Sequence, residues 1–141
     1  MIRIVACIAI LVQFLFSVPT VFSKNLSDQI LMYCLKGENI KEIRDHFRTS
    51  EKICAEFSFL PEEKETGVQF RWYNPKNKRA RVDFELVKSP MPPEKRTVAF
   101  WFILQSGLMD NIIGSRYSGT WRVEIWVNNR RITAKEFTVG N

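Results

Sequence analysis

Residues 119–141 read GTWRVEIWVNNRRITAKEFTVGN, and the alternation in this stretch decides the fold class. Apolar residues occupy every second position in its first half: Trp121, Val123, Ile125 and Val127. A period of two residues is typical of a strand with one face buried and one face in solvent. Asn128 and Asn129 follow, and asparagine tolerates the positive φ angles of a tight turn. The stretch therefore predicts a β-hairpin.

The strand that follows this turn changes phase. Ile132 and Ala134 lie in one phase, whereas Phe137 and Val139 lie in the opposite phase. One extra residue at positions 135–136, forming a β-bulge, restores the register without burying a charge. We therefore expect a bulge there.

Alternation also marks three earlier strands. Their apolar positions are Ile53, Ala55, Phe57 and Phe59 in the first, Val68, Phe70 and Trp72 in the second, and Val82, Phe84 and Leu86 in the third. Residues 73–78 are rich in types that favour turns and separate the second strand from the third, and the proline-rich loop 89–93 follows the third. A further run, 98–104, is apolar on both faces, which indicates either a strand covered on both sides or an exposed patch for a partner.

These runs give six strands, and an N-terminal segment adds a possible seventh. Residues 24–48 have a mixed pattern that is either helical or an irregular first strand. Short strands at this spacing predict an all-β fold, a single antiparallel β-sandwich of about seven strands.

The first 23 residues predict an export signal. Arg3 gives a positive start, and residues 4–16 form an apolar run of suitable length. A cleavage site before Lys24 leaves a domain of residues 24–141. The alternative is an uncleaved anchor, but polar residues interrupt the run before it reaches the roughly 20 apolar residues of a membrane span. We expect a periplasmic or secreted protein with no stable membrane span after cleavage.

The charge balance limits the partners. The chain has 21 basic and 15 acidic residues, and removing Arg3 leaves 20 against 15, or +5. This excess favours anionic partners, although the basic residues are spread along the whole chain. Export and the lack of a nucleic-acid-binding motif argue against nucleic acid as a partner.

Two cysteines, Cys34 and Cys54, remain once Cys7 has left with the signal. In an oxidising compartment they can pair in only one way, which predicts a structural disulfide. The competing interpretation is a redox or metal pair. Neither has support, because the spacing is not C-x-x-C and the only histidine, His46, has no second ligand in the pattern.

Residues for catalysis are sparse. A single histidine leaves no plausible Ser-His-Asp arrangement, and His46 lies in the charged segment EIRDHFR. Glu62 and Glu63 stand in a charged loop without the apolar surroundings that tune a catalytic acid. The six glycines form no phosphate-binding motif. The sequence therefore predicts no enzyme, no cofactor and no metal site.

A strand carrying FRWYNP (70–75), followed by the pattern of residues 119–139, resembles the immunoglobulin-like domains of small exported bacterial proteins of uncharacterised function. In those domains a G-x-W-x-V-x-[IV] strand, a turn and a final F-x-V strand close the fold. The resemblance covers residues 51–139 and implies an immunoglobulin-like sandwich. The antibody-type cysteine pair around a tryptophan is absent, because Cys34 and Cys54 both precede Trp72. Antibody-like recognition is therefore not implied.

The immunoglobulin-like strand order places the strand of Trp72 beside the strand of Trp121. Outward side chains of these strands and of the last strand then form a candidate binding surface: Arg71, Tyr73, Arg122, Trp126, Arg131, Thr133 and Lys135. Aromatic rings stack on sugars and arginines bind phosphate or carboxylate, so this surface suits an anionic or sugar-rich polymer. The alternative is ordinary sheet surface, where such residues only support cross-strand pairs.

These features predict an exported, non-catalytic binding or accessory module of the cell envelope. Its partner would be a protein or an anionic or sugar polymer. The alternative is a periplasmic, chaperone-like sandwich that offers an edge strand to a client protein. Such chaperones commonly have a second domain, which residues 24–141 are too few to hold.

Overall fold

The computed structural model describes residues 29–37, 40–89, 91–92, 94–104 and 117–140. The predicted export signal and most of the loop that precedes Gly119 lie outside these residues. Strands make up most of the described chain: β1 (Ile30–Lys36), β2 (Ile40–Ile43), β3 (His46–Phe47), β4 (Lys52–Phe59), β5 (Glu65–Tyr73), β6 (Arg79–Lys88), β7 (Arg96–Ile103), β8 (Gly119–Val127) and β9 (Arg130–Val139).

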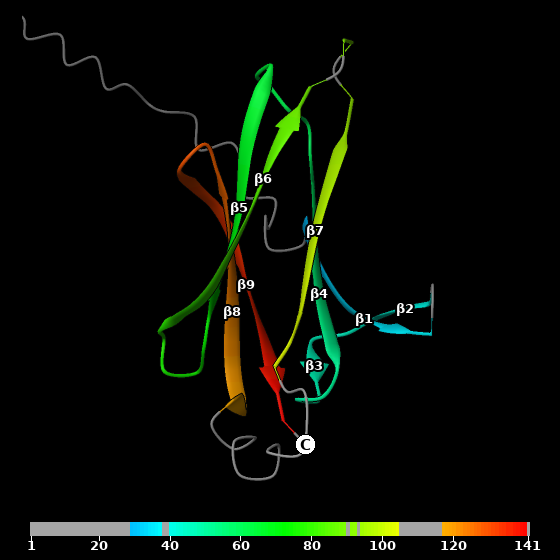
Figure 1. Ribbon diagram of the computed structural model, residues 1–141, viewed down its shortest axis with the longest axis vertical. Helices are drawn as coiled ribbons and strands as arrows, with labels where there is room; N and C mark the ends of the chain where they lie inside the picture. The colour runs from blue at the N-terminus through cyan, green and yellow to red at the C-terminus, as the bar shows by residue number, and fades with distance from the viewer. Residues whose placement is uncertain (1–28, 38–39, 90, 93, 105–116, 141) are drawn as a thin grey trace, which may run out of the picture.

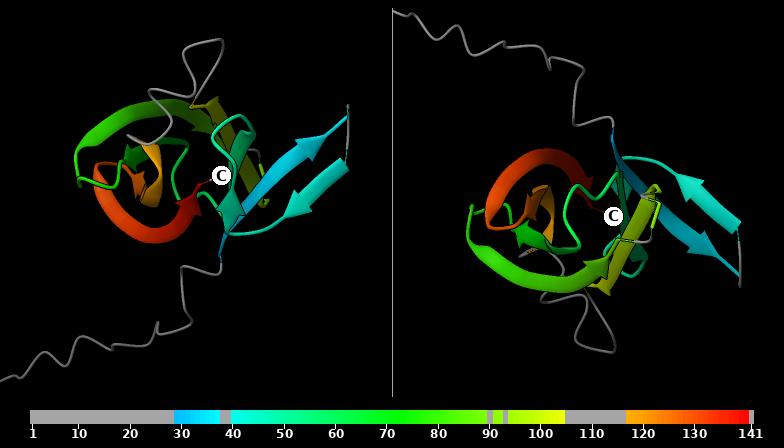
Figure 2. Two further views of the ribbon diagram at one scale, coloured as in Figure 1. Left: turned by 90° about the horizontal axis from the view of Figure 1, so that it is seen from below. Right: turned by 90° about the horizontal axis from the view of Figure 1, so that it is seen from above.

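The strands form two sheets that pack face to face (Figure 1). One sheet has the order β2-β1-β4-β7, and the other has the order β3-β9-β8-β5-β6. Neighbouring strands are antiparallel, except that β3 runs parallel to β9. Views along the long axis show the hairpin of β1 and β2 extending away from the sandwich (Figure 2).

This strand order is that of an immunoglobulin-like fold. Strands β1, β4 and β7 correspond to A, B and E of one sheet, and β5, β8 and β9 correspond to C, F and G of the other. β6 adds a strand beside β5, as the C′ strand of variable-type domains does. The prediction of an all-β, immunoglobulin-like sandwich is confirmed.

The core lies between the sheets and is rich in aromatic rings. Val68, Phe70 and Trp72 of β5 are completely buried, as their alternation predicted. Trp121 of β8 is buried as well, with 2% of its surface exposed. The ring centroid of Trp72 lies 4.6 Å from that of Phe102 in the opposite sheet. Aromatic side chains from both sheets therefore hold the two layers together.

Strand β6 carries its apolar residues on the solvent side. Val82, Phe84 and Leu86 are 45%, 57% and 51% exposed. They lie opposite outward-facing residues of β5 in the register of the two strands. Asp83 lies on the core side, where it accepts a hydrogen bond of 2.9 Å from Nε1 of Trp72. Alternation thus predicted the strand, although the apolar phase does not face the core.

Of the two interpretations of the N-terminal segment, the structure supports a first strand, and the helical one is wrong for the residues described. β1 pairs with β4, and its residues Ile30, Met32 and Cys34 face the core. Gly37 follows the strand with a φ of 65°, a conformation that glycine adopts without strain.

Among the described strands β7 is an edge strand, and only one of its two faces is buried, so the run 98–104 is neither central nor covered on both faces. Val98 and Phe102 face the core, whereas Trp101 and Ile103 are 52% and 45% exposed. Of the two interpretations of this run, the structure supports the exposed apolar surface.

The predicted disulfide is absent, because Cys34 and Cys54 are free and buried. They lie on adjacent strands, but Cys34 is opposite Ile53 and Cys54 is opposite Tyr33. Neighbouring residues of a strand point to opposite faces of the sheet. The Cys34 side chain therefore faces the core, while that of Cys54 faces the outer surface, and the two sulfur atoms point apart.

The hairpin of β8 and β9 has the predicted turn but a displaced bulge. Asn128 and Asn129 have φ angles of 47° and 64°, as a tight hairpin turn requires. The register between β8 and β9 shifts between Ile125 and Trp126, close to the turn. The bulge expected at 135–136 is therefore wrong in position.

Candidate functional site

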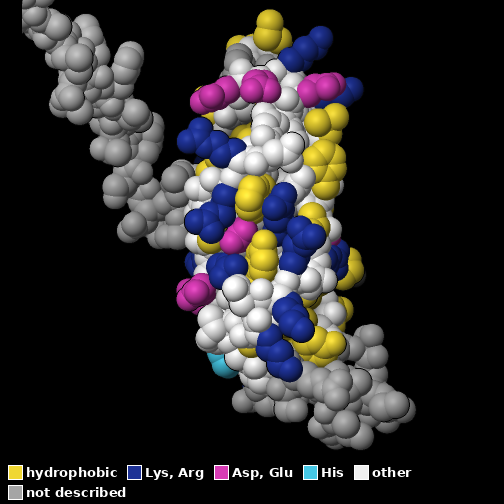
Figure 3. Space-filling view, turned by 90° about the vertical axis from the view of Figure 1, so that its left-hand side faces the viewer, with side chains coloured by type: hydrophobic (Ala, Val, Ile, Leu, Met, Phe, Trp, Pro, Cys, Tyr) yellow, Lys and Arg dark blue, Asp and Glu magenta, His cyan; other side chains and the backbone are white. Residues whose placement is uncertain are grey.

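The outer face of the five-stranded sheet carries cationic and aromatic side chains in alternation. We call the following residues the arginine–aromatic face: Arg71, Tyr73, Arg79, Arg122, Glu124, Trp126 and Arg131. The register brings them together, since Tyr73 is opposite both Arg122 on β8 and Arg79 on β6. Figure 3 shows basic and hydrophobic side chains interleaved on this side of the molecule, with acidic side chains mostly towards one end.

Two arginines of this face lie over aromatic rings. The guanidinium carbon of Arg71 lies 3.8 Å from the ring centroid of Trp126. The guanidinium carbon of Arg122 lies 4.5 Å from the ring centroid of Tyr73. Arg71 also donates hydrogen bonds from Nε and Nη2 to Oε1 of Gln69, at 3.0 and 2.8 Å. Both cations are thus held in fixed positions by neighbours on the same sheet.

Glu124 organises the middle of the face. Only 4% of this residue is exposed, although it lies on the outer side of β8. Its Oε1 lies 3.2 Å from Nε of Arg122 and 3.3 Å from Nη1 of Arg131. Its Oε2 accepts a hydrogen bond of 2.9 Å from Nε1 of Trp126. The side chains that bury this carboxylate also neutralise it, as a buried charge requires.

Lys135 does not belong to the face, contrary to the prediction. Because the bulge lies near the turn, Lys135 is opposite Val123, whose side chain is in the core. Its Nζ lies 3.2 Å from Oδ1 of Asp45 and donates to the carbonyl oxygen of Ile30 at 3.4 Å. Thr133 shares this phase and is buried. The other predicted residues of the candidate surface do come together.

Two residues of the face were missed from the sequence. Glu124 lies in the outward phase between Arg122 and Trp126, so its position was readable, but its role as a shared partner was not. Arg79 reaches Tyr73 only because the register of β5 and β6 shifts between Trp72 and Tyr73. No pattern in the sequence indicates that shift.

The face presents a cationic plane to solvent. It has four arginines and one carboxylate, Glu124, and the neighbouring Glu136 lies opposite Arg122, so the net charge of the face with this neighbour is 4 − 2 = +2. A guanidinium that stacks on a ring keeps its N–H groups at the edge, where they can bind an anion in a bidentate way. One face of each ring is already covered by an arginine, which favours an anionic ligand over a neutral sugar.

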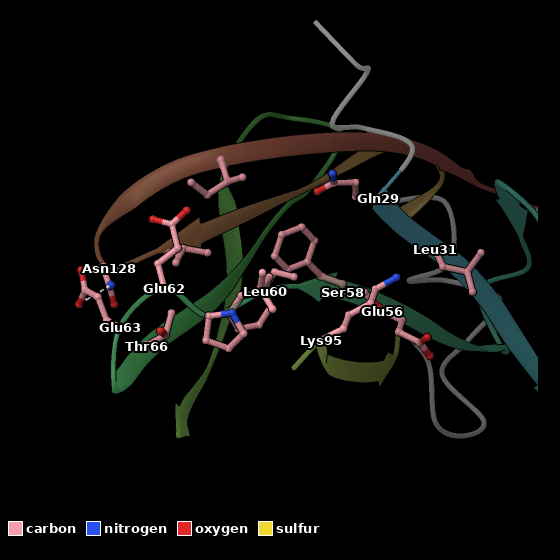
Figure 4. A pocket seen from close by; sticks show the side chains of 15 residues that line it. Gln29, Leu31, Glu56, Ser58, Leu60, Glu62, Glu63, Thr66, Lys95 and Asn128 are labelled. Atoms are coloured by element: carbon pink, nitrogen blue, oxygen red, sulfur yellow. Dashed lines mark hydrogen bonds between the residues drawn. The ribbon is translucent and has the colours of Figure 1, made fainter. Parts of the chain in front are cut away.

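A cleft lies between the two sheets, near the turn that joins β8 and β9 (Figure 4). Its volume is about 790 Å³, and its apolar wall includes Phe57 and Phe59, whose rings stack with centroids 5.6 Å apart. Glu62 and Glu63 line it together with Lys95. The cleft therefore combines an apolar wall with a mainly acidic rim.

The described residues that line the cleft do not include a set arranged for catalysis. Its one serine, Ser58, shares a hydrogen bond of 2.8 Å with Thr97 and has no histidine or carboxylate as a base. His46 lies elsewhere, with Nδ1 2.7 Å from Oγ1 of Thr138. Among the described residues no cluster of three or more histidine, cysteine or acidic side chains is placed to bind a metal.

Within the described part of the chain, no helix has the length and apolar character needed to cross a membrane.

No protein-family model matches the chain, and no curated protein is significantly similar to it. Among solved structures, it is similar to an immunoglobulin-like protein of Pseudomonas aeruginosa, with a TM-score of 0.48, 14% identity, and coverage of 79% of this chain and 91% of that chain. It is also similar to a Pseudomonas fluorescens alkylpurine DNA glycosylase bound to DNA containing an abasic site analogue, with a TM-score of 0.46 and 11% identity. That match covers 80% of this chain but only 31% of the glycosylase chain. Neither similarity bears on function.

Proposed function

We propose that the protein is an exported, non-catalytic binding module of the cell envelope that holds an anionic polysaccharide on its arginine–aromatic face. The observation that carries this proposal is the pair of stacked cations, Arg71 on Trp126 and Arg122 on Tyr73. The predicted export signal supports an envelope location, either periplasmic or secreted.

The shape of the face supports a polymer rather than a small molecule. Sites for small molecules are concave and bury most of the ligand, whereas this face is the outer surface of a sheet. Arg71 and Arg122 lie on neighbouring strands, and Arg131 lies on the next strand. In the register, Arg71 is opposite Glu124, whereas Arg131 is opposite Trp126, two residues further along β8. The cations are therefore spread over three neighbouring strands about 4.8 Å apart and along the strands, which suits an extended ligand.

The proposal is tested by chromatography on immobilised dextran sulfate, with neutral dextran as the matched matrix. We expect retention on dextran sulfate at low salt and none on dextran, because guanidinium groups bind the sulfates. The variant Arg71→Gln with Arg122→Gln should lose retention. Replacing Tyr73 and Trp126 by serine should lower the salt concentration of elution, because the arginines are no longer held on rings.

The opposite sheet offers a matched control. Lys41 and Lys52 also lie over aromatic rings, at 4.8 Å from the Tyr33 centroid and 3.8 Å from the Trp101 centroid. The variant Lys41→Gln with Lys52→Gln removes the same charge from the other face and should be retained like the wild type. Equal losses in the two double variants would mean that only net charge matters, and the proposal would be wrong. Wild-type protein that is not retained on dextran sulfate would also refute it.

A further inference from the structure

A row of apolar side chains borders the arginine–aromatic face. Val82, Phe84 and Leu86 lie two residues apart on the edge strand β6, and about half of each is exposed. Val82 is opposite Arg71, and Phe84 is opposite Gln69, so the row shares the outer side of the sheet with the arginines. We call Val82, Phe84 and Leu86 the apolar row.

The apolar row has no role in the core. The core side of β6 carries the buried Val87 and, towards its start, Arg81 and Asp83, whose Nη2 and Oδ1 atoms lie 2.7 Å apart. Charges on the inward side of an edge strand discourage pairing with other strands, which explains why charged residues lie on the core side of β6. The opposite side is solvent-facing and would ordinarily be polar. Three exposed apolar residues in line, next to cations, indicate a contact surface.

The chemistry of the combined surface matches an anionic lipid bilayer. Arginines pair with lipid phosphates, apolar side chains enter the boundary between headgroups and acyl chains, and Trp and Tyr favour the same depth. Trp126 is opposite Gln69, which is in turn opposite Phe84, so the indole and the apolar row share one side of the sheet. Gly67 leaves room for the Phe84 ring, because a Cβ there would lie 3.1 Å from Cε2 of Phe84.

We infer that the protein docks on an anionic lipid surface, with the apolar row at the headgroup level and the arginines on the lipid phosphates. This inference goes beyond the proposed function, because it requires the apolar row in addition to the cations. A soluble polysaccharide needs only the cations. The charge complementarity of the arginines with lipid phosphate is what selects a lipid surface over a neutral partner.

The test is flotation of the full-length mature chain with vesicles of equal parts phosphatidylglycerol and phosphatidylcholine, and with phosphatidylcholine vesicles alone. We expect binding only to the anionic vesicles. The variant Phe84→Ser with Leu86→Ser should lower the vesicle partition coefficient by about tenfold or more, because two apolar side chains no longer enter the interface. Thermal unfolding of the variant checks that it remains folded.

Strand β7 supplies the matched control. Trp101 and Ile103 are also an aromatic and an aliphatic residue two positions apart on an edge strand, and they are 52% and 45% exposed on the other sheet. The variant Trp101→Ser with Ile103→Ser should bind vesicles like the wild type. Fluorescence quenching by brominated lipids gives the orientation of the protein on the vesicle. With Trp101 replaced by phenylalanine, brominated lipids should quench the fluorescence of Trp126.

The outcomes separate this inference from the proposed function. Loss of vesicle binding with unchanged retention on dextran sulfate, for the variant at Phe84 and Leu86, supports both. Wild-type protein that is retained on dextran sulfate but does not float with anionic vesicles overturns the inference alone. Floating without retention overturns the proposed function alone. If the wild type is dimeric and the Phe84 variant monomeric, a second copy covers the apolar row, and the lipid inference is overturned.

Discussion

Replacing Trp72 with phenylalanine tests how the core and the edge strand β6 are joined. Trp72 is completely buried, and its Nε1 donates a hydrogen bond of 2.9 Å to Oδ2 of Asp83. The Asp83 carboxylate is also nearly buried, with 10% of its side chain exposed, and Arg81 is its other partner. A phenyl ring keeps most of the packing but removes the donor.

The expected cost follows from these contacts. A hydrogen bond to a charged group contributes about 1.5–3 kcal/mol, and an acceptor oxygen that stays buried without a donor loses its compensation. The smaller ring also leaves part of the indole volume empty in a close-packed core. We therefore expect Trp72→Phe to lower the free energy of unfolding by about 2–3 kcal/mol. That is a large share of the roughly 5–15 kcal/mol of a typical domain.

Urea denaturation followed by far-ultraviolet circular dichroism measures this loss. Trp101→Phe is the control, because Trp101 is half exposed and an exposed substitution changes stability by about 0.5 kcal/mol or less. A double-mutant cycle with Asp83→Ala isolates the bond between the two side chains. If Trp72→Phe costs no more than Trp101→Phe, the hydrogen bond to Asp83 contributes nothing and the reasoning is refuted.

Two further predictions concern titratable side chains. Burial alone would raise the pKa of Glu51, but hydrogen bonds from the Arg48 amide and from Arg44 hold it below its usual 4.5. Glu51→Gln should therefore cost about 1 kcal/mol at neutral pH, and urea titrations should show the difference shrinking as the pH falls below 4.5 and through the lowered pKa of Glu51; a difference that stays constant as the pH falls would contradict this. Burial raises the pKa of the Cys54 thiol, so iodoacetamide should label Cys54 only after unfolding, as mass spectrometry would show; rapid labelling of the folded protein would contradict this.

The alternation of the sequence predicted the strands well, because a period of two residues depends only on the local backbone. It predicted the buried face of β5 correctly, but for β6 it did not reveal which face is the core. Alternation divides a strand into two faces, and the choice between them depends on the register with the neighbouring strand. At β6 the core side meets the Trp72 indole, whose N–H requires an acceptor, so Asp83 lies there and the apolar residues lie outside.

Two other misjudged features have a common physical cause, the direction of side chains across a sheet. The pairing of Cys34 with Cys54 was inferred from their number, whereas disulfide formation depends on the direction of the two Cβ atoms. The change of apolar phase along β9 showed that the strand contains a bulge, but it did not show at which residue the bulge lies. Its position near the turn places Lys135 inside and leaves Arg131 on the outer side. Single-residue register therefore decides which cations reach the candidate surface.

The same contacts that stabilise the arginine–aromatic face also prepare it for a ligand. An arginine in solution has many rotamers, and fixing it on binding costs about 0.5–1.5 kcal/mol. Here Arg122 and Arg131 are already held by the carboxylate of Glu124, and Arg71 is held on the ring of Trp126. Most of that ordering cost is met when the sheet folds, so an anion that takes the free N–H edges gains more of its interaction energy. Glu124 lowers the net positive charge of the face, but by fixing the arginines it makes the remaining charge more effective for binding an extended anionic surface.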